Sequence, residues 1–304
     1  MGDNITAPGG PAGAAPALAD APPEDAPRYT PEWLALREPA DAAARAAELL
    51  GPLRAHLASA VPPGGRIVVR DLGCGTGSMG RWLAPRLPGP QHWILHDHDP
   101  GLLAHAVTAL PAAAADGTPV TAAAAPGDLT RLDAAGLAGA TLVTASALLD
   151  LLTAAEVEAL ADACAAAGLP ALLTISVVGR VGLDPAEPFD AELAAAFNDH
   201  QRREHGGRRL LGPDAVPAAR AAFERHGYVV RTAPSPWRLG PDERALVAEW
   251  LRGWVAAACE QRPELAAEGE AYLRRRLAEC AAGRLRVVVG HDDLLALPPG
   301  GGGR

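Results

Sequence analysis

A run of seven residues from Asp71 to Gly77, Asp-Leu-Gly-Cys-Gly-Thr-Gly, constrains the fold of this chain more than any other stretch. It follows the apolar β-formers Ile67-Val68-Val69. After it, apolar residues recur at the three- and four-residue spacing of an amphipathic helix: Met79, Trp82, Leu83 and Leu87. Glycine permits positive φ and removes the Cβ that would block a ligand from the backbone. The free N–H groups at the start of the helix then face that ligand, so the sequence predicts a strand, a ligand-binding turn and a helix.

A second apolar strand, Trp93-Ile94-Leu95, ends near the acidic residue Asp97. A carboxylate some twenty positions after a glycine turn can accept hydrogen bonds from the hydroxyls of a ribose. The segment from Gly75 to Gly80 also satisfies the dinucleotide pattern G-x-G-x-x-G. The pattern therefore predicts a nucleotide-type cofactor, and it leaves open whether that cofactor is a dinucleotide.

The longer pattern, Asp71-x-Gly73-x-Gly75-x-Gly77, resembles motif I of the class I S-adenosylmethionine-dependent methyltransferases. The run from Asp97 to Pro100 (Asp-His-Asp-Pro) resembles the acidic loop that follows the second strand in that family. The third glycine comes two residues after the second, which suits a single nucleoside with an amino-acid tail. The resemblance covers residues 65–180 by motif and the rest by the order of elements, and it implies S-adenosyl-L-methionine as the cofactor.

The resemblance also implies which residues bind this cofactor: Asp71, Gly73, Cys74, Gly75 and Gly77 around the ribose and methionine, Asp97 on the ribose, His98 against the adenine, Asp128 and Leu129 at the adenine amino group, and Ser146 at the methionine end. Three of these roles have structural alternatives. Asp71 can brace the amides of the turn instead of binding the ammonium group, His98 can be a surface histidine, and Asp128 can cap a helix. In small-molecule relatives the N-terminal helices cover the cofactor. Arg37 or Arg45 can then reach a carboxylate, although a surface salt bridge of Arg45 with Asp41 is the simpler expectation.

The family places its reaction at the end of the fourth strand, here Ala145 to Asp150. The tetrads Asn-Pro-Pro-Tyr and Asp-Pro-Pro-Tyr of the nucleic-acid and glutamine amino-methyltransferases are missing there, which favours another acceptor. We expect a small-molecule acceptor that is methylated at oxygen. Asp150 is a candidate for orienting or deprotonating its hydroxyl, with helix capping as the alternative. His200, within the polar run from Asn198 to Arg202, is a second candidate base, with a solvated helix face as the alternative.

Strands and helices alternate after residue 65, which predicts a parallel sheet with helices on both faces. The resemblance to the methyltransferase family implies the finer form of this α/β fold, a Rossmann-like sheet of seven mostly parallel strands whose last strand is antiparallel. We expect disordered tails at 1–28 and 298–304, an N-terminal helical cap at 29–64, and a methyltransferase domain at 65–297 that includes a helical insertion at 241–282. Within the cap, Pro39 is expected to interrupt a helix that resumes at Asp41. The fifth strand is expected at 171–178 and the last strand at 284–290.

Composition excludes several other classes. The chain has 304 residues, 49% of them hydrophobic, which is enough for a sizeable core. Its net charge of −9 and the lack of lysine disfavour binding to nucleic acid. Four scattered cysteines predict neither a zinc site nor disulfides. The runs His96-Asp97-His98-Asp99 and His291-Asp292-Asp293 contain metal-ligand types, but neighbours in a strand point to opposite sides, so no metal is expected.

No segment has the run of about 20 apolar residues that a membrane span needs, and residues 1–27 lack the features of a secretion signal. A cytoplasmic location without membrane partners is the expectation, and a homodimer is compatible with it. Two rival functions stay open. One is a nicotinamide-dependent oxidoreductase on the same turn, although a Tyr-x-x-x-Lys dyad is excluded because the chain has no lysine. The other is a non-catalytic S-adenosylmethionine-binding partner protein.

Overall fold

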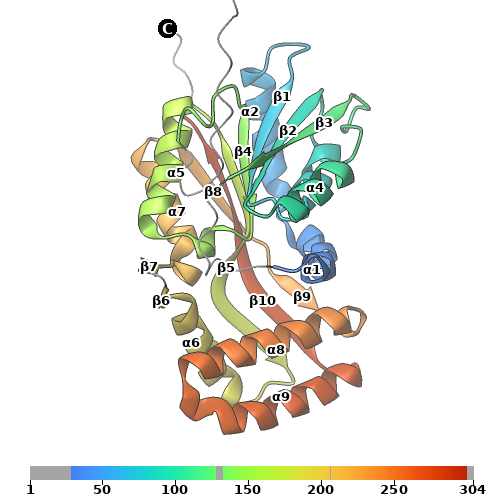
Figure 1. The fold of residues 1–304 in the computed structure, drawn as a ribbon, viewed down its shortest axis with the longest axis vertical. Coiled ribbons are helices and arrows are strands. Elements are labelled where there is room, and N and C mark those ends of the chain that lie inside the picture. Colours follow the sequence, from blue (N-terminus) through green and yellow to red (C-terminus); the bar gives the residue numbers. More distant parts are fainter. Residues whose placement is uncertain (1–28, 128–132, 206, 300–304) are drawn as a thin grey trace, which may run out of the picture.

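A mixed β-sheet forms the centre of the molecule, with helices on both faces (Figure 1). The computed structural model describes residues 29–127, 133–205 and 207–299. The strand order is β3-β2-β1-β4-β5-β10-β8, and β9 pairs with the first half of β10, ahead of the part that pairs with β8. The strands of this sheet are β1 (Ile67–Leu72), β2 (Gln91–Asp97), β3 (Val120–Pro126), β4 (Leu142–Ser146), β5 (Ala171–Asp184), β8 (Val229–Pro234), β9 (Trp237–Leu239) and β10 (Arg286–Leu297). A separate hairpin pairs β6 (Glu204–His205) with β7 (Arg208–Arg209).

The direction of the strands confirms the predicted fold class. β1 runs parallel to β2 and β4, and β4 runs parallel to β5. β10, the last strand in the chain, is antiparallel to both of its neighbours, β5 and β8. The sheet is therefore Rossmann-like and mostly parallel, with the last strand antiparallel as predicted. It has eight strands rather than seven because the short β9 also pairs with β10.

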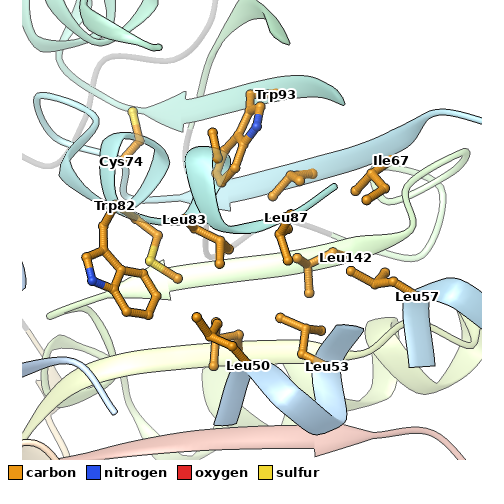
Figure 2. Packing of buried hydrophobic residues seen from close by; sticks show 14 of the residues in the cluster. Leu50, Leu53, Leu57, Ile67, Cys74, Trp82, Leu83, Leu87, Trp93 and Leu142 are labelled. Carbon is orange, nitrogen blue, oxygen red and sulfur yellow. The ribbon is translucent and has the colours of Figure 1, made fainter. Parts of the chain in front are cut away.

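Two hydrophobic cores cover the two faces of the sheet. The helices are α1 (Pro31–Ala44), α2 (Leu50–Ala60), α3 (Ser78–Leu83), α4 (Pro100–Ala109), α5 (Ala154–Ala167), α6 (Phe189–Gln201), α7 (Ala215–Arg225), α8 (Arg244–Gln261) and α9 (Ala266–Ala281). Leucines of α2 face the sheet and α3 in one core, which α4 completes (Figure 2). α5 and α7 pack on the opposite face. The neighbours Leu142 and Val143 belong to different cores, because side chains alternate along a strand.

A third core lies beyond the parallel strands, where the long ends of β5 and β10 extend toward α8 and α9 (Figure 1). Both strands are longer than predicted: β5 continues to Asp184 and β10 to Leu297. The run His291-Asp292-Asp293 consequently lies inside β10. The helices α8 and α9 lie between β9 and β10, in the segment expected to be an insertion, and the domain boundaries themselves stay a prediction. Across the described ranges, no helix is both long and apolar enough to cross a bilayer.

The prediction that Pro39 interrupts the first helix is wrong. α1 continues through Pro39 and ends at Ala44, and the following residue, Arg45, has an extended ψ of 131°. Proline leaves the carbonyl four residues earlier, that of Ala35, without its helical partner. Both Ala35 and Pro39 are exposed, so water can satisfy that carbonyl. The helix ends where the N–H of Ala46 donates instead to the carboxylate of Asp293, at 2.8 Å.

Asp293 joins three distant segments of the chain. Besides Ala46, its carboxylate accepts hydrogen bonds from the N–H of Ile175 at 2.7 Å and from the hydroxyl of Ser235 at 2.5 Å. Asp293 is only 1% exposed. Ile175 has a φ of 55°, a left-handed conformation that is strained for a β-branched residue. The hydrogen bond to Asp293 stabilises this kink in β5.

Replacing Asp293 by Ala should lower the free energy of unfolding by about 3 kcal/mol, because two buried backbone donors and one hydroxyl lose their acceptor. Urea denaturation followed by circular dichroism measures this change. Asp292→Ala is the matched control: among the described residues, its half-buried carboxylate has only a long contact of 3.9 Å, with Arg180. Equal effects of the two substitutions would contradict the anchoring role of Asp293.

Candidate functional site

The turn between β1 and α3 has the predicted strand–turn–helix geometry. Gly73, Gly75 and Gly77 have φ values of 59°, 54° and 87°, a conformation that glycine adopts without strain. A Cβ on Gly77 would lie 3.1 Å from the Cβ of Ala106, so α4 approaches this turn closely. The turn lies at the carboxyl end of β1, which has β2 on one side and β4 on the other. In α/β sheets such a switch point is where ligands bind.

Asp97 fixes the end of β2 to the turn. Its Oδ2 accepts a hydrogen bond from the N–H of Gly75 at 2.9 Å, and its Oδ1 accepts one from the N–H of Asp99 at 3.0 Å. Carboxylate oxygens have further lone pairs, so Asp97 can still accept a hydrogen bond from a ligand hydroxyl. The ribose role of Asp97 stays a prediction. His98 is exposed, with Nδ1 3.6 Å from Oδ1 of Asp97.

Asp71 is fully buried, and one of its two carboxylate oxygens has a hydrogen-bond partner among the described residues. Its Oδ1 accepts a hydrogen bond from the hydroxyl of Thr144 at 2.7 Å. Its Oδ2 has no hydrogen-bond partner among the described residues. Burial raises the pKa of Asp71 to about 7, against the opposing effects of Thr144 and Arg45. In the described part of the chain the amides of the turn do not donate to Asp71; Asp97 braces them instead, so the bracing role considered for Asp71 belongs to Asp97.

Cys74 is a structural member of the turn. Its N–H donates to the carbonyl of His96 at 2.9 Å, and its sulfur lies 3.5 Å from the carbonyl oxygen of Gly75. Burial, with Asp71 and Asp97 nearby, raises the pKa of the Cys74 thiol far above its usual range. The thiol therefore stays protonated and is a poor nucleophile.

Two further predicted residues lie at the end of β4. The hydroxyl of Ser146 accepts a hydrogen bond from Nη2 of Arg45 at 3.0 Å. Asp150 follows in a single 3₁₀ turn, and burial raises the pKa of its carboxyl while Arg37 opposes that rise. Asp150 does not cap α5, because Thr153 and Glu156 form the predicted capping box there. The carboxyl of Asp150 is thus not engaged in helix capping.

His200 lies apart from this group of residues. It is on α6, which packs mainly on α8, and its Nε2 is 3.2 Å from a carboxylate oxygen of Glu260. Burial and Arg203 lower the pKa of His200, and Glu260 opposes them. Its catalytic role stays a prediction. Asp128 and Leu129 fall outside the described residues.

The position of Arg45 differs from the one expected from the sequence. The expected pair of Asp41 with Arg45 is wrong, because Asp41 instead binds Arg37 at 2.9 Å and accepts from the indole N–H of Trp237 at 2.9 Å. Arg45 is 4% exposed and donates to the hydroxyls of Ser78 and Ser146. The one signal in the sequence for a buried position of Arg45 was that it lies within a run of alanines, residues 42–47, and not among the polar residues typical of an exposed helix face.

The two histidine–aspartate runs have other partners. Nε2 of His96 lies 3.2 Å from a guanidinium nitrogen of Arg70. The ring of His291 packs against that of Trp237, with centroids 5.1 Å apart. No group of three or more His, Cys, Asp or Glu side chains that could hold a metal ion occurs within residues 29–127, 133–205 and 207–299.

The chain is similar to several solved structures, and all the similarities are distant. No family model and no curated protein matches it. A cyclopropane synthase from Mycobacterium tuberculosis aligns over 88% of this chain and 94% of its own, with 14% identity and a TM-score of 0.43. A SAM-dependent methyltransferase from Geobacter sulfurreducens, in complex with S-adenosyl-L-homocysteine, aligns over 89% and 99%, with 19% identity and a TM-score of 0.42. Magnesium protoporphyrin IX methyltransferase from Synechocystis aligns over 62% and 76%, with 16% identity and a TM-score of 0.36.

The raised pKa of Asp71 predicts a dependence of stability on pH. The folded-state pKa of about 7 is above the ordinary value of 3.8, so the folded protein holds a proton that the unfolded chain releases between these values. The Asp71 contribution to stability is therefore full at acidic pH and is lost as the pH rises through about 7. The difference in unfolding free energy between the wild type and Asp71→Asn should fall from pH 5 to pH 8 in urea titrations. If the unfolding free energies of the two proteins change in parallel with pH, the raised pKa of Asp71 is excluded.

In its glycine turn, in the acidic end of its second strand and in a mostly parallel sheet with an antiparallel last strand, this chain resembles the class I S-adenosylmethionine-dependent methyltransferases.

Proposed function

We propose that this protein is an S-adenosylmethionine-dependent methyltransferase that acts on a small molecule. The observation that carries the proposal is the hydrogen bond of 2.9 Å between Gly75 N–H and Asp97, which joins the glycine turn to the acidic end of β2. This contact joins the backbone of the turn to a carboxylate at one edge of the sheet, and a carboxylate in that position can accept hydrogen bonds from a ribose. A single adenosyl group with an amino-acid tail matches both parts.

The residues of the turn would bind and orient the cofactor. Asp97 would accept hydrogen bonds from the ribose hydroxyls, and the half-satisfied carboxylate of Asp71 would bind the ammonium of the methionine tail. S-adenosylmethionine supplies a methyl group that its sulfonium already activates for in-line displacement. The remaining task for the protein is to hold the acceptor in line with that methyl and to exclude water.

The acceptor's nucleophile would lie near the end of β4, and we infer that it is a hydroxyl oxygen. Desolvation raises the pKa of the Asp150 carboxyl above its ordinary value, which suits a base that takes a proton from a hydroxyl. α1 lies beside the carboxyl ends of the parallel strands, between the sheet and α8 (Figure 1), which favours a small acceptor over a polymer. The net charge of −9 points the same way.

A nicotinamide-dependent oxidoreductase is the second candidate, and Gly80 favours it. A Cβ on Gly80 would lie 2.5 Å from Leu110 and 3.5 Å from Trp93 of β2. The third glycine of the dinucleotide pattern has this same role in the close packing of helix and strand. The two candidates differ in the ligand that they bind, so a direct titration separates them.

The wild type should bind S-adenosylhomocysteine and not NADH in calorimetric titrations. Asp97→Ala should weaken the binding of S-adenosylhomocysteine by more than tenfold, equivalent to about 1.4 kcal/mol. Asp116→Ala is the control, since Asp116 likewise accepts from a glycine N–H, that of Gly89, at an exposed position. Binding of NADH alone would support the oxidoreductase, and an unchanged affinity in Asp97→Ala would refute the ribose role.

Transfer of a labelled methyl group tests the candidate bases. In a small-molecule extract, the wild type should pass label from methyl-labelled S-adenosylmethionine to a hydroxyl-bearing product. Asp150→Asn should reduce the rate by about a hundredfold or more, with unchanged affinity for S-adenosylhomocysteine. His200→Ala tests the alternative base: loss of transfer in this variant alone would assign the role to His200. Cofactor binding without transfer to any acceptor would favour a non-catalytic partner protein.

A further inference from the structure

One face of β1, β2 and β3 lies outside the three hydrophobic cores, apart from Leu72 at the end of β1. On the opposite face, Val69 and Trp93 are fully buried in the core that α2, α3 and α4 complete. On this face, Val68 of β1 and Ile94 of β2 are only half-buried. α5 and α7 lie over the same face at β4, β5 and β10 (Figure 1). Parallel strands are normally covered on both faces, so this surface is an exception.

The connection from β3 to β4 explains why this face is left without a core. α3 follows β1, α4 follows β2 and α5 follows β4, whereas the described residues 133–141 between β3 and β4 form turns. The chain reverses its direction across the sheet between β3 and β4. Because crossovers between parallel strands are right-handed, a helix in that connection would lie on the face opposite α3 and α4. A helix is about 10 Å wide and strands are about 4.8 Å apart, so this face has room for one helix.

The same face carries cationic side chains. Nη1 of Arg70 lies 3.2 Å from Nε2 of His96, and Nε of Arg70 is buried without a hydrogen-bond partner among the described residues. Burial lowers the pKa of Arg70. Burial and then Arg70 lower the pKa of His96 to about 4, so its ring is neutral at pH 7. Arg66 lies close enough to His92 to lower its pKa in addition to the effect of burial. In a chain with a net charge of −9, this surface is locally cationic.

A described helix of a second copy is a poor occupant of this cationic face. Each of the helices α1 to α9 already places apolar side chains in one of the three cores. The two-fold symmetry usual for dimers would also bring the cationic face of one copy against that of the other, where like charges repel. The charge of the face therefore favours an acidic partner, and its area favours a helix.

We propose that an acidic amphipathic α-helix of a partner protein packs on β1, β2 and β3, with its apolar side on Val68 and Ile94 and its carboxylates on Arg66 and Arg70. Arginine suits this role because its planar group can bind both oxygens of a carboxylate. The buried Nε of Arg70 then gains an acceptor. The partner's helix also supplies the second layer that a parallel sheet needs. The proposal stands on the sheet face and does not rest on the proposed methyltransferase function.

Fluorescence anisotropy with two labelled peptides tests the proposal. Each peptide is a stapled amphipathic helix of about 16 residues, which matches the length of β2. One carries Glu on its polar side, and the other carries Lys at the same positions. The wild-type chain should bind the Glu peptide about tenfold more tightly than the Lys peptide or better, and added salt should weaken that binding. Arg70→Gln should weaken the binding of the Glu peptide about tenfold, because the paired donors and their charge are lost. Arg231→Gln, the control, alters an exposed arginine of β8 at the other end of the sheet and should leave the affinity unchanged.

Several outcomes would overturn the proposal. These are binding of neither peptide, equal binding of both, and an unchanged affinity in Arg70→Gln. A dimer in sedimentation that Ile94→Asp dissociates would assign the face to a second copy. Binding of the Glu peptide only after removal of residues 1–28 would assign it to that segment, and tighter binding of a DNA duplex would assign it to nucleic acid. Should Arg70→Gln fail to fold, Arg66→Gln at an exposed position provides the test: it should weaken the binding of the Glu peptide alone, and an unchanged affinity would contradict the proposal.

Discussion

Three buried donors converge on the carboxylate of Asp293, and the arrangement of the candidate site depends on them. The contact with Ala46 ends the first helix. It also directs the preceding residue, Arg45, toward the carboxyl ends of β1 and β4. The contact with Ile175 holds a left-handed residue in β5, which costs about 1–3 kcal/mol for a non-glycine residue. Hydrogen bonds with buried groups thus stabilise a backbone that local preferences would not produce.

The same face of the sheet changes from apolar to polar toward this edge. On β1, Val69 of the core is followed on that face by Asp71, and on β4, Leu142 is followed by Thr144. The leucines of α2 cover the apolar part (Figure 2), and Arg45, just before that helix, reaches the polar part. The packing that stabilises the fold therefore also fixes the distance between the glycine turn and the buried polar groups of the site.

Local signals in the sequence were sufficient for the main elements. The glycine turn and the capping box at Thr153 follow from residue types at fixed short spacings. The antiparallel last strand was expected from the family resemblance. The end of α1 could not be predicted in this way, since its cause is the hydrogen bond from Ala46 to Asp293, 247 residues further along the chain. The prediction of a helix break at Pro39 was wrong although its signal is local. The carbonyl that proline leaves without a helical partner is exposed to water, so the helix continues.

In the candidate site, too, some residues could be identified from local motifs and others depend on distant parts of the chain. The turn and Asp97 were identified from a motif, and the structure brings them into contact. The polar run around His200 has the residue types of a catalytic site, yet Asn198 binds the carbonyl of Gly179, and Arg202 pairs with Asp214. Residue type alone does not distinguish a catalytic group from a group that joins two helices. The partners of each side chain decide between these roles, and they come from distant parts of the chain.

A crystal structure of the protein with S-adenosylhomocysteine would show whether the glycine turn and Asp97 bind an adenosyl group. We expect the ribose hydroxyls on Asp97 and the ammonium on Asp71, with the adenosyl group against the turn from Gly73 to Gly77. Density for the ligand elsewhere, or a dinucleotide at this edge of the sheet in its place, would contradict it.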